Sequence, residues 1–67
     1  MPEQSEALLT DPRDAILDAA ALCFMERGFN ATSIDDIARR LSATKGMVYH
    51  YFDSKAQLFF EIHHRAM

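Results

Sequence analysis

Residues 33–52 read SIDDIARRLSATKGMVYHYF, and this stretch decides the fold of the chain. Ser33 and Asp36 lie three residues apart, the spacing at which a hydroxyl and an acidic side chain cap a helix start reciprocally. The apolar residues that follow are spaced i, i+3, i+4 and i+7: Ile34, Ile37, Ala38 and Leu41. This spacing predicts a short amphipathic helix whose apolar side faces a core.

A second short helix is predicted directly after the first. Thr44 can cap it, and so few residues separate Leu41 from Thr44 that the chain must turn sharply, as it does in a helix-turn-helix. This helix, about residues 44–51, would bury Val48 and Phe52. The other side chains are left free to meet a ligand: Lys45, Gly46, Met47, Tyr49 and His50.

One longer helix is predicted before this pair. Asp11 can cap a helix over residues 12–27, because its carboxylate can accept from the free amides of the first turn. Gly28 can end the helix, and Phe29 can then pack back on Phe24, the apolar contact typical of a glycine C-cap.

A further helix is predicted after the pair. Ser54 and Gln57 form a second capping box, and an apolar stripe follows: Leu58, Phe59, Ile62 and Ala66. No stop signal follows this stripe, so we expect the helix to continue into a C-terminal domain absent from the sequence. The expected organisation is a mobile arm over residues 1–11, an all-α three-helix, homeodomain-like bundle over 12–52, and the start of a fourth helix over 53–67.

Composition limits the classes of function. The chain has 67 residues and a net charge of -3, the opposite sign from that typical of DNA-binding proteins. Residues 1–38 hold two basic and eight acidic residues, whereas residues 39–67 hold five basic and two acidic ones, so one face can be locally basic. Without a secretory signal, a run of ~18 apolar residues or a second cysteine beside Cys23, we expect a cytoplasmic protein that does not enter a membrane.

Residues 32–40, with the motifs Thr44-Lys45-Gly46, Tyr49-His50-Tyr51-Phe52 and Ser54-Lys55, resemble the DNA-binding signature of TetR-family transcriptional repressors. The resemblance covers residues 13 to 62. It departs from the family pattern at two positions: the family usually has glycine in the turn where this chain has Ser42, and commonly a small polar residue where it has Met47.

The resemblance and the residue chemistry together predict a DNA-binding site. Its residues are Thr32, Ser33, Thr44, Lys45, Gly46, Met47, Tyr49, His50, Tyr51 and Lys55. Lys45 can reach a guanine edge or a phosphate, and Met47 can contact a thymine methyl group. The family resemblance implies phosphate contacts for Tyr49, His50 and Lys55.

Several of these residues have a second interpretation. Gly46 either lets the backbone approach the major groove or packs closely against another helix, and Tyr49 and Tyr51 either face DNA or belong to the core. Arg39 and Arg40 either reach phosphate or pair with neighbouring carboxylates.

The resemblance implies a homodimer on double-stranded DNA with a palindromic operator, associated with the nucleoid. It also implies a small-molecule effector on the C-terminal domain, while no cofactor or metal is predicted for these residues. His63 and His64 are adjacent, so their side chains point in different directions on a helix, which disfavours a metal site. The sequence shows no set of residues typical of a catalytic site, so we expect that the protein is not an enzyme. The alternative that keeps the fold is a helical protein-interaction module.

Overall fold

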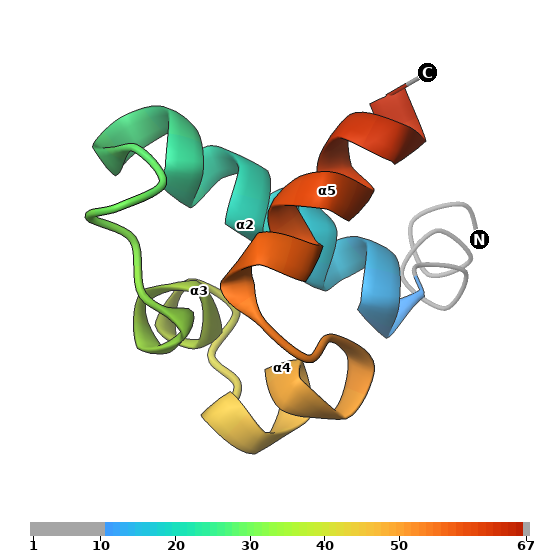
Figure 1. Ribbon diagram of the computed structural model, residues 1–67. Coiled ribbons are helices and arrows are strands. Elements are labelled where there is room, and N and C mark those ends of the chain that lie inside the picture. Colours follow the sequence, from blue (N-terminus) through green and yellow to red (C-terminus); the bar gives the residue numbers. More distant parts are fainter. Residues whose placement is uncertain (1–10, 67) are drawn as a thin grey trace, which may run out of the picture.

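The computed structural model describes residues 11–66, with side chains through His64, and this range is all-helical (Figure 1). Its elements are α2 (Pro12–Arg27), α3 (Ile34–Arg40), α4 (Lys45–Tyr51) and α5 (Lys55–Ala66). The predicted all-α class and the helix order are therefore confirmed. The arm predicted over residues 1–11 lies outside the described residues except for Asp11.

The longest helix, α2, has the predicted ends. The Asp11 carboxylate accepts from the Arg13 amide at 3.0 Å, and the Gly28 amide donates to the Phe24 carbonyl at 2.7 Å. Gly28 has a φ of 88°, a conformation that favours glycine. The Phe29 ring packs on Phe24 with centroids 5.4 Å apart, as predicted.

The helices surround one small core. α2 packs against both α5, which crosses it, and α3, while α4 packs against α3 at the far side of the bundle (Figure 1). The fully buried large side chains come from every helix, from the loop before α3 and from the residue that caps the end of α4: Ile16, Leu17, Thr32, Ile37, Val48, Phe52 and Leu58. Because each helix contributes to the same cluster, the orientation of α4 depends on all the others.

The two short helices begin with the predicted caps. The Ser33 hydroxyl accepts from the Asp36 amide at 3.1 Å, and the Asp36 carboxylate accepts from the Ser33 amide at 3.0 Å, which completes the capping box. The Thr44 hydroxyl accepts from the Met47 amide at 3.2 Å. These bonds satisfy amides that have no partner within the helix.

The start of α5 differs in detail from the prediction. The Gln57 amide donates to the Ser54 hydroxyl at 3.1 Å, but the Gln57 side chain accepts from the Asp53 amide instead of the Ser54 amide. Leu58 is buried and Ile62 is half-buried, whereas Phe59 is 41% exposed. Ala66, the last member of the predicted stripe, lies beyond the described side chains.

The turn between α3 and α4 is a Schellman motif. The Ala43 amide donates to the Ala38 carbonyl at 2.9 Å, and the Ser42 amide donates to the Arg39 carbonyl at 3.1 Å. Ser42 has a φ of 56°, and among the described residues it is the non-glycine residue with a left-handed backbone conformation. Its Cβ strains this conformation, which explains why glycine suits the position better.

We predict that Ser42→Gly raises the free energy of unfolding by about 0.5–1 kcal/mol. Glycine removes the strain of the left-handed conformation in the folded state, and this gain exceeds the free-energy cost of the greater entropy that glycine gives the unfolded chain. For a domain of this size the thermal midpoint should rise by a few degrees. Ser42→Ala is the control, since it keeps the Cβ and should give no such gain. Equal stabilisation by both variants would contradict the explanation.

Candidate nucleic-acid interface

The short helix α4 is anchored on one side and open on the other. Val48 is fully buried and Phe52 is 1% exposed, so both fix the helix to the core. The opposite side consists of exposed residues, together with the cap: Thr44, Lys45, Gly46, Tyr49 and His50. A polar surface is thus presented on a helix whose position is set by buried contacts.

Gly46 lies in open space on this surface. A Cβ built at Gly46 would meet Thr44 Oγ1 at 3.8 Å, an ordinary van der Waals distance, and no other helix comes as near. The interpretation that Gly46 allows close packing of helices within this domain is therefore wrong. Glycine costs about 1 kcal/mol relative to alanine inside a helix, and the fold gains nothing in return at this position.

The two tyrosines of α4 differ in exposure. Tyr49 is 49% exposed, which excludes the core interpretation for this residue. Tyr51 is half-buried and packs against the core, with the His50 ring edge-on at a centroid distance of 4.9 Å. Met47 is also half-buried against the core, so part of its surface already has an apolar partner.

The positive charge of Lys45 is only weakly compensated. Its Nζ lies 3.9 Å from Asp35 Oδ1, at the limit of an ion pair, and both side chains are more than half exposed. Exposed pairs of this kind contribute little to stability. Lys45 is therefore available to another anion.

Two predicted contact residues combine capping with exposure. Ser33 and Thr44 are exposed, and each hydroxyl oxygen accepts from an amide of its own helix. A hydroxyl that accepts such a bond still carries its own proton, so it can donate to an oxygen outside the protein.

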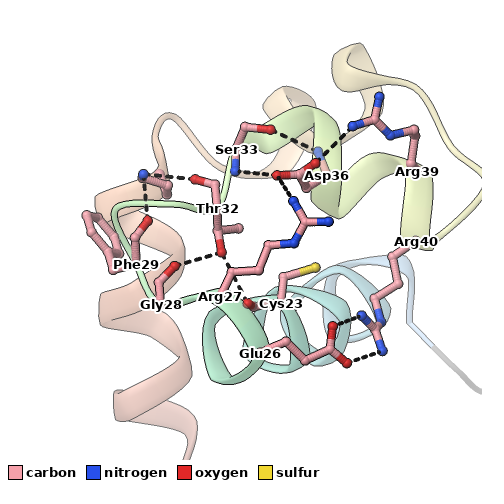
Figure 2. Close-up of polar contacts among 11 residues, drawn as sticks. Cys23, Glu26, Arg27, Gly28, Phe29, Thr32, Ser33, Asp36, Arg39 and Arg40 are labelled. Atoms are coloured by element: carbon pink, nitrogen blue, oxygen red, sulfur yellow. Dashed lines mark hydrogen bonds and ion pairs between the residues drawn. The ribbon is translucent and has the colours of Figure 1, made fainter.

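Thr32, one of the predicted DNA contacts, is buried and only 2% exposed. Its hydroxyl donates to the Gly28 and Cys23 carbonyl oxygens, which lie 2.8 and 3.1 Å from it (Figure 2). Thr32 ties the loop after α2 to the last turn of that helix, and its hydroxyl cannot meet a phosphate without leaving the interior.

Lys55 also has partners inside the molecule. Its Nζ donates to the Phe29 carbonyl at 2.7 Å and to the Thr32 carbonyl at 2.9 Å, and lies 4.4 Å from the centroid of the Phe29 ring. No pattern in the sequence indicates these contacts, because the partners are 26 and 23 positions away and are backbone atoms.

The arginines of α2 and α3 pair with carboxylates (Figure 2). Arg40 donates to both oxygens of Glu26, at 2.9 and 3.0 Å, which joins α3 to α2. Arg27 and Arg39 lie 3.1 and 2.9 Å from opposite oxygens of Asp36. Of the two interpretations of Arg39 and Arg40, the structure therefore favours pairing with carboxylates.

These pairs surround a polar hollow of about 320 Å³. Its lining residues are Cys23, Glu26, Arg27, Asp36, Arg39 and Arg40. Hydrogen bonds from the Ser33 backbone amide, and then from other neighbours, lower the pKa of Asp36, and the hydrogen bond from Arg40 lowers that of Glu26.

A second hollow, of about 330 Å³, is apolar and lies between α2 and α5. It is lined by Ala21, Phe24, Met25, Phe59, Ile62 and His63. Among the described residues, no three histidine, cysteine or acidic side chains gather as a metal site would require, and no described helix has the length and apolarity to span a membrane.

Comparisons with known proteins agree on the region that contains these helices. The family model described as "Bacterial regulatory proteins, tetR family" matches residues 16–62. The HTH-type transcriptional repressor KstR2 of Rhodococcus jostii (strain RHA1) is 46% identical over 50 residues, which are 75% of this chain and 24% of that repressor.

The biofilm operon icaADBC HTH-type negative transcriptional regulator IcaR of Staphylococcus aureus (strain Newman) is 38% identical over 47 residues, which are 70% of this chain and 25% of that regulator. The chain thus spans about a quarter of the length of these curated relatives. No solved structure gives a significant match.

The lowered pKa of Asp36 predicts a loss of stability in acid. As the pH falls below about 4, the unfolded chain takes up a proton at this carboxyl before the folded chain does, so the stability that Asp36 contributes at neutral pH is lost as the pH falls through its lower folded pKa. Asp36→Asn keeps an oxygen for the Ser33 amide but does not titrate. Its thermal midpoint should lie below the wild-type midpoint at pH 7 and approach it near pH 3, whereas parallel curves would contradict the role of Asp36.

Proposed function

Because this chain belongs to the tetR family of bacterial regulatory proteins, we propose that α3 and α4 form a helix-turn-helix whose second helix enters the DNA major groove. The observation that carries the proposal is the open polar side of α4, opposite the buried Val48 and Phe52. A recognition helix must be fixed to its domain while its reading side chains stay exposed, and α4 meets both requirements.

Each exposed residue has a proposed role. Lys45 reads a guanine edge or grips a phosphate, Gly46 lets the backbone approach the bases, and the exposed part of Met47 contacts a thymine methyl group. Hydroxyl and ring groups position the domain on the sugar-phosphate backbone. These are Ser33, Thr44, Tyr49, His50 and Tyr51.

Electrostatics support this orientation despite the net charge of -3. Asp36 and Glu26 pair with arginines, so their charges are compensated within the domain. The Lys45 Nζ lies 3.9 Å from its nearest carboxylate partner, Asp35 Oδ1, so this charge is only weakly compensated. A phosphate that approaches α4 thus meets a cation that has little competition.

Family membership also supports a proposal for the finer features of the function. We propose that residues 12–52 are the DNA-binding unit and that residues 53–67 lead toward a domain that binds a small-molecule effector and forms a homodimer. Two recognition helices would then meet half-sites of a palindromic operator ~34 Å apart, and an effector that changes this distance would alter binding. Repression in the bacterial cytoplasm, at the nucleoid, is the proposed outcome, and a catalytic role is not proposed.

The first test is binding of the full-length protein, with the proposed dimerisation domain, to a genomic fragment library at two salt concentrations. We expect enrichment of a palindrome, with affinity that falls steeply as salt rises, because lysine contacts release counterions from DNA. Lys45→Ala should weaken binding and change the base preference, whereas Arg27→Ala removes an equal charge at the end of α2 and should leave the preference unchanged. Absence of salt-sensitive enrichment would point instead to the alternative, a helical module that binds a protein.

Gly46→Ala should have opposite effects on stability and binding. The added methyl group meets only Thr44 Oγ1, at 3.8 Å, so the free energy of unfolding should rise by up to ~1 kcal/mol through helix propensity. On the proposed DNA-facing side the same group should lower affinity by about tenfold, equivalent to ~1.4 kcal/mol. Thermal melts and titrations of the selected duplex measure both effects, and unchanged affinity in a stabilised variant would mean that the backbone does not approach DNA at Gly46.

A further inference from the structure

Lys55, the first residue of α5, is bound to a loop far from it in sequence. Its half-buried ammonium group donates to the carbonyls of Phe29 and Thr32, at 2.7 and 2.9 Å, and lies over the Phe29 ring. An ammonium group has three donors, and these two bonds use two of them. Lys55 therefore joins the start of α5 to the segment between α2 and α3.

That segment leads directly into Ser33. The Thr32 hydroxyl ties it to the end of α2 through the Gly28 and Cys23 carbonyls (Figure 2). The Thr32 amide donates to the Phe29 carbonyl at 3.3 Å. Lys55 holds the same segment through the Thr32 carbonyl. The residue before the cap of α3 is thus fixed from two directions, by α2 and by α5.

We propose that Lys55 is a positioning residue that sets the Ser33 end of α3 for DNA, and that it does not itself grip a phosphate. This inference rests on the proposed function for its DNA readout. A move of Nζ to a phosphate would break charge-assisted bonds to two carbonyls in a half-buried setting, which is costly. The Phe29 carbonyl would keep only the longer bond from the Thr32 amide, at 3.3 Å. Lys45 has no comparable obstacle, since its ion pair is long and exposed.

Salt dependence distinguishes a positioning residue from a phosphate contact. The slope of log affinity against log salt decreases in magnitude by about 0.9 for each phosphate contact removed. Loss of a positioning residue lowers affinity at every salt concentration and leaves the slope unchanged. Lys45 and Lys55 should therefore behave differently although both are lysines.

The experiment compares Lys55→Met with Lys45→Met in the full chain, on the selected duplex, at several salt concentrations and well below the thermal midpoint. For Lys55→Met we expect a midpoint lower by about 5 °C, an affinity lower by roughly tenfold, and the wild-type slope. For Lys45→Met we expect an unchanged midpoint and a slope smaller by about 0.9. Lys55→Gln, which keeps a donor, replaces Lys55→Met if the latter does not fold.

Leu58→Val separates positioning from general stability. It trims a fully buried side chain of the same helix, so it should lower the midpoint by a similar amount yet keep wild-type affinity at low temperature. Unchanged affinity of Lys55→Met under these conditions would overturn the positioning role. A slope of log affinity against log salt that is smaller by about 0.9 would overturn it too, whatever the thermal midpoint.

Failure of the proposed function gives a different pattern. If the wild-type chain binds no DNA, that function fails, and the melting comparison alone tests whether Lys55 holds the loop. A lower midpoint for Lys55→Met then supports the loop contact, and an unchanged midpoint overturns it.

Discussion

Helices of seven residues are not stable alone in water, because the entropic cost of nucleation exceeds what so few hydrogen bonds return. Both α3 and α4 have this length, and they carry the whole candidate interface. They depend on buried anchors, Ile37 in α3 and Val48 with Phe52 at the end of α4. The long helix α2 and the crossing helix α5 supply the surface against which these anchors pack.

The loops between the helices add precision to that packing. Hydrogen bonds of Thr32 and Lys55 fix the segment before α3, and a Schellman motif closes the segment after it. In the second case Ser42 adopts a left-handed conformation, so that α4 can begin three residues later, at Lys45. The angle between the short helices is therefore set by specific bonds as well as by apolar contact.

Charge is distributed in a way that the net value of -3 does not convey. Glu26 binds Arg40 between two helices, and Asp36 serves at once as helix cap and as partner of two arginines. Because these acidic groups are compensated on the side of α2 and α3, the cation of Lys45 remains available on α4.

Local chemistry in the sequence determined the helices, their caps and the family, since caps such as Ser33 with Asp36 and the spacing of apolar residues act within a few positions. It also predicted that Lys45, Tyr49 and His50 are exposed. The sequence alone did not determine that Gly46 faces open space, that Thr32 is buried or that Lys55 binds two carbonyls. The Lys55 bonds join residues more than twenty positions apart, and the Thr32 hydroxyl binds backbone carbonyls, which no residue code reveals. Which side of Gly46 stays open depends on how α4 packs on the rest of the bundle, so only the tertiary structure decided these facts.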